Sequence, residues 1–191
     1  MKNNILKTGF IIILAMSIVS FTTVAEKSVN VKDSNISWKG YKVTGSHEGT
    51  INLDKGMLMF DDNNNLTGGT FTMDMTSIAV TDLKAGEGKE KLEGHLKSDD
   101  FFGVNNHNKA MFTINKVDGK NGTYRVYGDL TIKGITKPAT FQMTVNNNMA
   151  TANFKIDRTK YDIRYGSASF FDDLKDKAIY DEFDLNVTLK F

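Results

Sequence analysis

The sequence has no cysteine and only one proline, Pro138, among its 191 residues. Without cysteine the chain has neither disulfides nor thiolate metal ligands. Small eukaryotic secreted domains tend to be dense in disulfides, so this chain is more typical of a bacterial protein. It also lacks a Gly-x-Ser-x-Gly nucleophile elbow and a phosphate-binding glycine loop. We therefore predict a protein that is not an enzyme and that uses no cofactor.

An excess of either charge is missing as well. The chain carries 24 Lys and Arg against 23 Asp and Glu, and the two signs are interleaved along it. A nucleic-acid-binding protein usually shows a basic excess or a basic stripe. We therefore expect no nucleic-acid partner.

Long apolar runs are confined to the N-terminus. A basic start is followed by an apolar stretch at residues 10–19 and by Thr23-Val24-Ala25, which places small residues where a signal peptidase reads the chain. The apolar stretch is too short to span a bilayer comfortably. We predict a cleaved signal peptide over residues 1–25, a single domain over residues 26–191, and a periplasmic or secreted location in a bacterium. No integral membrane segment should remain after cleavage; an uncleaved anchor is the alternative.

Apolar and polar residues alternate in several segments that are separated by clusters rich in Gly and Asn. The clearest example ends the chain, where every second residue from Phe183 to Phe191 is apolar. A period of two is typical of half-buried strands, and six or more such strands indicate an antiparallel sandwich or barrel. The domain length favours a barrel of about eight strands, whose interior either fills with side chains or holds one small ligand. We predict an all-β fold, an antiparallel eight-stranded barrel with a short helical segment.

Three segments interrupt this alternation. Residues 82–98 are too polar and too rich in Gly for a strand and predict a short helix or a long loop, with Leu83, Leu92 and Leu96 as its apolar contacts. Residues 170–177 are expected to close one end of the sheet. Asp118–Gly122 predicts a hairpin loop.

The inward-facing positions of the predicted strands are the first candidates for a ligand site. Met and Phe side chains adapt to irregular apolar shapes, so these positions suit a flexible apolar ligand, although a filled core has the same pattern. The candidates are Phe71, Met73, Phe112, Ile114, Leu130, Ile132, Phe141, Met143, Phe154 and Ile156.

The histidines offer a different function. His47, His95 and His107 could ligate a zinc ion with water in the fourth position. Their spacing does not place two of them on one face of one element, so we predict no metal site and keep a histidine-based metalloprotein or enzyme as the alternative. A filled barrel that acts as a surface interaction protein is the third hypothesis.

Parts of the sequence resemble motifs of the YceI-like family. The segment from His95 (HLKSDDFFGV) together with AMF at 110–112 is similar to the family's HLxSxDFF-V-…-F motif. Residues 124–141 (YRVYGDLTIKGITKPATF) resemble its YxVxGDLTIxGxTKPV block almost residue for residue. Residues 154–161 (FKIDRTKY) are similar to a third, shorter motif, and Asp181-Glu182 matches the family's last strand entry. The resemblance covers roughly residues 28–191.

This resemblance implies an elongated, lipocalin-like barrel that carries a polyisoprenoid or a related long-chain lipid in its lumen and that serves in transport. An apolar tube suffices for this task, since each buried CH₂ contributes about 0.8 kcal/mol. The sequence leaves open whether the protein is a homodimer.

The family motifs add individual residues to the candidate site. His95, Phe101 and Phe102 match the first motif, with roles in packing or in lining the lumen. Asp157 and Arg158 match the third motif and are expected to form a hydrogen-bonded or ionic brace, with Arg158 as the candidate contact for a charged head group. In the long block Pro138 is expected to fix a strand entry.

The sequence also departs from the family pattern. The segment around His47 differs from the commoner strand pattern, and His107-Asn108 stands where the family usually shows Tyr-Pro. The segment after Tyr165 is short and acidic, and this region often forms the mouth of such barrels. We expect the identity of the ligand to depend on these segments.

Overall fold

The computed structural model describes residues 24–191. The predicted signal peptide therefore lies almost entirely outside the described residues. The chain forms one antiparallel sheet, with a helix between the fourth and fifth strands in sequence order. Its elements are β1 (Ala25–Ser28), β2 (Asn35–Lys42), β3 (Gly45–Phe60), β4 (Leu66–Val80), α1 (Lys89–Lys97), β5 (Lys109–Lys120), β6 (Thr123–Ile132), β7 (Ile135–Asn146), β8 (Met149–Asp157), the short 3₁₀ helices η1 (Arg158–Tyr161) and η2 (Lys175–Lys177), and β9 (Glu182–Lys190).

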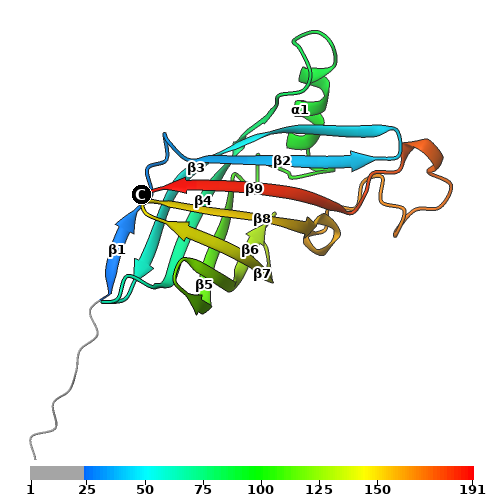
Figure 1. Cartoon of the computed structure of the whole chain (residues 1–191). Coiled ribbons are helices and arrows are strands. Elements are labelled where there is room, and N and C mark those ends of the chain that lie inside the picture. Colours follow the sequence, from blue (N-terminus) through cyan, green and yellow to red (C-terminus); the bar gives the residue numbers. More distant parts are fainter. Residues whose placement is uncertain (1–23) are drawn as a thin grey trace, which may run out of the picture.

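The sheet closes on itself. Its strands follow the order β1-β3-β2-β9-β8-β7-β6-β5-β4, and β3 also pairs with β4. Strands β2 to β9 thus form a closed eight-stranded barrel, and β1 is an additional strand on β3 (Figure 1). The predicted antiparallel eight-stranded barrel with a short helix is confirmed, and the sandwich alternative is wrong. Within residues 24–191 no helix has the length and apolar character to cross a membrane.

The hairpin turns are tighter than the sequence suggested. The predicted loop at Asp118–Gly122 shrinks to two residues, because β5 continues to Lys120 and β6 begins at Thr123. Asn121 and Gly122 have positive φ angles of 57° and 83°. Two such residues in succession allow the type of turn whose twist matches the flanking strands.

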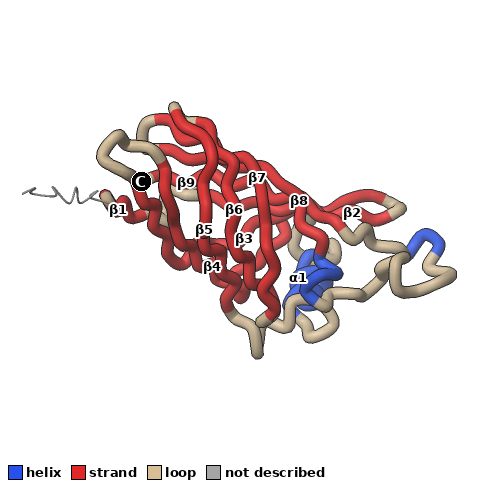
Figure 2. The backbone as a smooth tube through the Cα atoms, turned by 90° about the horizontal axis from the view of Figure 1, so that it is seen from below, coloured by secondary structure: helices blue, strands red, loops and turns tan. Residues whose placement is uncertain are grey.

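The barrel has a sealed end, where β1 and the C-terminus lie (Figures 1 and 2). Phe60 is 1% exposed and its ring lies 5.6 Å from that of Phe191. The Lys27 ammonium group lies 4.6 Å and 5.3 Å from the centroids of these two rings. Because the side chain carries its charge over aromatic faces, a cation covers this end without being buried in an apolar core.

The opposite end carries α1 and the segment between η1 and β9 (Figures 1 and 2). The carboxylate of Glu93 accepts a hydrogen bond from the Val80 backbone N–H at 2.8 Å, which fixes α1 to the end of β4. Leu92 and Leu96 lie on the face of α1 that lines the barrel interior. Their spacing of four residues places them on one side of the helix. The prediction of a short helix within residues 82–98 is therefore correct.

One seam of the barrel has a short ladder. Strands β7 and β8 pair only from Met143↔Ala152 to Asn146↔Met149, and away from their shared turn they splay apart (Figure 1). In an antiparallel pair of strands joined by a two-residue turn, hydrogen-bonded and non-hydrogen-bonded residue pairs alternate, starting with a hydrogen-bonded pair next to the turn. Pro138 in β7 lies opposite Asp129 in β6 and falls in a non-hydrogen-bonded pair. The N–H that this proline lacks would have pointed toward β8. The expectation that Pro138 fixes a strand entry is wrong, since it lies inside β7 at a position where no partner strand needs a donor.

Close packing in the wall gives a first prediction. A Cβ atom on Gly128 would lie 2.3 Å from the Thr113 carbonyl oxygen and 2.6 Å from the Phe112 ring. We expect Gly128→Ala to lower the free energy of unfolding by about 2 kcal/mol, because a backbone strand would have to move. Chemical denaturation measures this value.

Gly94 in α1 provides the matched control, because a Cβ atom there meets nothing within 4 Å. Gly94→Ala should leave stability unchanged or raise it by up to about 1 kcal/mol through helix propensity. Equal destabilisation by the two variants would contradict the packing described for Gly128.

Candidate functional site

The barrel encloses a cavity of about 330 Å³. All eight barrel strands contribute side chains to its wall, together with α1 and the residues that follow it. Ligand pockets commonly have volumes of about 300–1,000 Å³. The barrel is therefore not filled by its own side chains, and the hypothesis of a filled barrel is wrong for this molecule.

The structure brings nearly all residues predicted from the sequence into this wall. Ile114 is the exception: it is 7% exposed, and its Cδ1 lies next to Gly69, away from the cavity lining. The predicted residues that line the cavity are Phe71, Met73, His95, Phe101, Phe102, Phe112, Leu130, Ile132, Phe141, Met143, Phe154, Ile156 and Arg158.

The residues of β2, β3 and β9 that line the cavity were not predicted from the sequence. In β9 the alternation was visible, and its inward residues Phe183, Leu185 and Val187 line the cavity. In β2 and β3 the wall residues include Trp38 and Ile51, whose strand lacked a clear family counterpart. The period of two in β3 ends at Leu53, because the pairing with β4 shifts register between Leu53 and Lys55.

Aromatic rings cover one side of the lumen. Phe112 lies 5.2 Å from Phe141, and Phe141 stacks on Phe154 with centroids 4.1 Å apart and an interplanar angle of 7°. Phe71 lies 6.4 Å from Phe112 and extends the row to β4. The stack of Phe141 on Phe154 also spans the seam where β7 and β8 diverge. Side chains, not backbone hydrogen bonds, therefore close this part of the wall.

Polar groups of the wall gather at the end that carries α1. They are Tyr41, Lys42 and His47 in the β2–β3 hairpin, His95 in α1, Arg158 after β8, and Tyr180 before β9. Lys42 and Tyr180 are exposed, so the cavity reaches the surface here. We call this end the mouth. An apolar interior with a polar mouth matches a molecule that has a long apolar part and one polar end.

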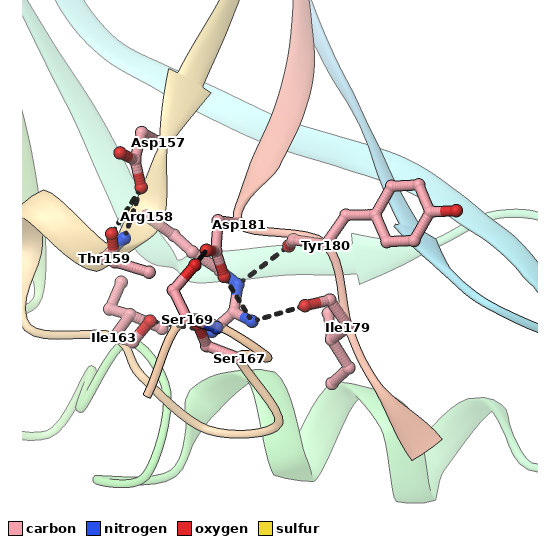
Figure 3. A network of polar contacts seen from close by, with 9 residues as sticks. All are labelled: Asp157, Arg158, Thr159, Ile163, Ser167, Ser169, Ile179, Tyr180 and Asp181. Atoms are coloured by element: carbon pink, nitrogen blue, oxygen red, sulfur yellow. Dashed lines mark hydrogen bonds and ion pairs between the residues drawn. The ribbon is translucent and has the colours of Figure 1, made fainter. Parts of the chain in front are cut away.

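Arg158 is the most deeply buried polar residue at the mouth, with 2% of its surface exposed. Its guanidinium group donates hydrogen bonds to the carbonyl oxygens of Ile163 at 2.7 Å, Ile179 at 3.0 Å and Tyr180 at 3.1 Å (Figure 3). Burial lowers the pKa of Arg158, against the opposing effect of the Asp181 and Asp157 carboxylates. The group stays charged, since an arginine pKa is far above neutrality. This side chain thus joins the end of β8 to the segment that leads into β9.

Arg158 pairs with a different carboxylate from the one that the sequence predicted. Asp157 accepts hydrogen bonds from the backbone N–H and the hydroxyl of Thr159 and caps η1, while the carboxylate that pairs with Arg158 belongs to Asp181, at 3.7 Å. Burial raises the pKa of Asp181, but hydrogen bonds from Ser167 and Ser169 and the charge of Arg158 outweigh burial and lower it below its ordinary value. The expectation of a brace that Asp157 and Arg158 form with each other is wrong, because the ion pair is made across the mouth.

The three histidines lie in different surroundings. The His47 ring nitrogen Nδ1 is 2.8 Å from the Asp82 carboxylate, whereas the His95 ring packs edge-on against Phe101 and Tyr165. His107 lies beside Gly134 and does not line the cavity. Among the residues that the structure describes, no three His, Asp or Glu side chains are arranged as metal ligands. The histidine-based metal alternative therefore has no assembled site in residues 24–191.

Comparison with known sequences identifies relatives over most of the chain. The family model described as YceI-like domain matches residues 27–191. A UPF0312 protein of Vibrio parahaemolyticus is 28% identical over 150 residues, which cover 74% of this chain and 73% of that protein. A UPF0312 protein of Staphylococcus aureus is 37% identical over 90 residues, which cover 41% of this chain and 50% of that protein.

Solved structures share the fold. BcnA of Burkholderia cenocepacia superimposes with a TM-score of 0.66 at 20% identity, over 84% of this chain and 98% of BcnA. A polyisoprenoid binding domain of Saccharophagus degradans gives 0.58 at 14% identity, over 87% and 97% of the two chains. The Campylobacter jejuni YCEI protein gives 0.54 at 18% identity, over 100% and 98%.

The Arg158 contacts give a second prediction. We expect Arg158→Met to lower the free energy of unfolding by about 3 kcal/mol, because three carbonyl oxygens would lose their donor and Asp181 its partner. Arg164→Met is the control, since Arg164 is exposed and pairs with Asp162 at the surface. It should change stability by less than about 1 kcal/mol. Urea denaturation measures both values, and similar small effects in both variants would contradict the structural role of Arg158.

Proposed function

The chain belongs to the YceI-like family, and from this premise we propose that it is a binding protein for a long apolar ligand, which lies in the barrel lumen. The observation that carries the proposal is the apolar cavity of about 330 Å³ that opens at one polar end. Burial of each CH₂ group contributes about 0.8 kcal/mol, so a chain of several isoprene units can be bound without a single charged contact. The role is one of binding rather than catalysis.

The ligand class of the proposal is a polyisoprenoid or a related long-chain lipid. One structural relative with the same fold is a polyisoprenoid binding domain. The Phe and Met side chains of the wall support a branched, flexible chain, because aromatic faces and thioethers adapt to its irregular shape. The rings of Phe112, Phe141 and Phe154, from β5, β7 and β8, offer flat apolar surface to such a chain.

We further propose that the protein acts in the bacterial periplasm or outside the cell and carries its ligand between membranes or enzymes. A lipid of this kind is poorly soluble, so a soluble carrier needs a cavity that removes the chain from water. The N-terminal sequence with its basic start, apolar stretch and small residues supports export.

Ligand binding is tested by extraction and by a variant that narrows the cavity. Gly40 lies at an inward position of β2, lines the cavity and has nothing within 4 Å of its Cβ position. Mass spectrometry of an organic extract of the purified protein should show a stoichiometric long-chain lipid. Gly40→Leu should weaken binding of added phytol about tenfold, equivalent to ~1.4 kcal/mol. The fluorescence of Trp38, the one tryptophan of the chain and a wall residue, reports the titration.

Lys39→Leu serves as the matched control, because this neighbouring side chain is half exposed and pairs with Glu48 on the outside of the barrel. It should bind phytol as the unmodified protein does. An extract without lipid, together with no uptake of phytol, would refute the proposed function. Equal effects of both leucine variants would place binding outside the cavity.

Export is tested separately. Expression of the full chain in a bacterial host should yield a periplasmic protein whose N-terminus, read by intact mass, is Glu26. Retention of residues 1–25 in the membrane fraction would contradict the proposed cleavage and favour an anchor. Ala25→Arg should block processing, because signal peptidase requires a small residue at this position.

A further inference from the structure

The charges of the cavity wall restrict the ligand beyond its length. Two wall residues are formal cations, Arg158 and Lys42. Arg158 already donates to three carbonyl oxygens and lies 3.7 Å from a carboxylate oxygen of Asp181. Lys42 is exposed at the rim of the mouth. Within the described part of the chain the wall contains no Asp or Glu.

Below the rim, where Lys42 lies, the wall therefore offers no uncompensated charge to an ionised head group. Transfer of a carboxylate or a phosphate from water into an apolar cavity is strongly unfavourable unless an opposite charge meets it. Using Arg158 for this purpose would break the contacts that join β8 to the segment before β9. A neutral head group carries no such penalty.

Two buried polar atoms at this end make no hydrogen bond with a described residue, Asp181 Oδ1 and His95 Nε2, but only the first has an ionic partner, the Arg158 guanidinium group at 3.7 Å. The Nε2 atom of His95 is buried and makes no hydrogen bond with any described residue. His47, the other histidine of the wall, differs in this respect because Asp82 holds its ring. A buried polar atom without a partner is unfavourable, and a ligand group that supplies the partner recovers that free energy.

The position of His95 places its ring at the entrance of the apolar lumen. Its ring lies 5.5 Å from that of Phe101, inside the cavity wall, and 4.4 Å from that of Tyr165, which is about half exposed. Leu92 and Leu96 of the same helix face line the cavity beside it. A ring rotation that turns Nε2 toward the lumen breaks no hydrogen bond of this atom.

We propose that His95 binds the polar end of the ligand through Nε2 and that this end is a neutral hydrogen-bonding group, an alcohol or a carbonyl, and not a phosphate or a carboxylate. The inference rests on the proposed function, because it assumes that the chain of the ligand occupies the lumen. A neutral imidazole presents either a donor or an acceptor at Nε2, according to its tautomer. Nε2 of His95 therefore donates a hydrogen bond to a carbonyl oxygen in one tautomer and accepts one from a hydroxyl group in the other.

The test compares three probes that share one branched skeleton: phytol, the hydrocarbon phytane, and phytyl diphosphate. The unmodified protein should bind phytol more tightly than either of the others, as followed by Trp38 fluorescence. His95→Leu should weaken phytol binding about tenfold and leave phytane binding unchanged. His95→Gln, which retains a hydrogen-bonding group, should restore part of the affinity for phytol. His107→Leu is the control, because His107 does not line the cavity, and it should bind all three probes normally.

The outcomes separate this inference from the proposed function. If phytane and phytol bind but His95→Leu weakens both equally, His95 has only a packing role and the inference is overturned while the function stands. Tight binding of phytyl diphosphate by the unmodified protein would also overturn it, since a charged head would then be accepted. If none of the three probes binds, the proposed function fails and the inference fails with it.

Discussion

The pairing of β3 with β4 decides what this molecule can contain, because it joins the two sides of the sheet into a closed wall. An eight-stranded barrel has an interior that side chains can just fill or that can hold one small ligand. In this barrel the side chains leave a cavity, since small residues occupy inward positions on several strands. Gly40, Ala110 and Ala152 all line the cavity, and larger residues in their places would occupy the same space. Closure creates the tube, and these small residues keep it open.

The two ends of the tube differ in chemistry, and this difference gives the site a direction. At one end Phe60, Phe191 and Lys27 seal the barrel with rings and a cation. At the other end the polar wall residues gather, and Arg158 connects the strands that border the opening. Because the arginine is fully engaged in this structural role, it stabilises the shape of the mouth and leaves recognition to other groups. The candidate contact predicted for Arg158, a charged head group, would have to compete with three carbonyl oxygens.

The alternation of apolar and polar residues predicted the fold and much of the cavity wall, because it shows which face of a strand points inward. In β6 and β7 the period of two runs through the inward residues, so that Leu130 and Met143 could be assigned to the interior from the sequence. Parity indicates the face of a strand but not the depth along the barrel axis. Ile114 has the same parity as Phe112, yet it lies beyond the end of the cavity. In β3 the register shifts near Leu53 change the parity, and the inward residues on either side of the shift no longer form one series.

Contacts between distant segments were beyond prediction. The partners of Arg158 lie at positions 163 and 179–181, in a segment without periodicity, and nothing in the sequence specifies that they converge on one guanidinium group. The isolation of His95 Nε2 is likewise a property of the packed structure, because only the surroundings of an atom determine whether it has a partner. The helix itself and its apolar contacts could be predicted, since they depend on local composition.

The short ladder between β7 and β8 leaves one seam of the barrel with few backbone hydrogen bonds. Elsewhere in the wall, a wider lumen would require the loss of several backbone hydrogen bonds at once. Between Pro138 and Gln142 the strand β7 has no partner in β8, and the stack of Phe141 on Phe154 bridges the interval. An aromatic contact of this kind is worth only about 0.5–1.5 kcal/mol beyond its buried area, and its rings can slide without breaking a ladder. Among the eight seams, this one therefore needs the fewest backbone hydrogen bonds to break for the circumference of the barrel to change.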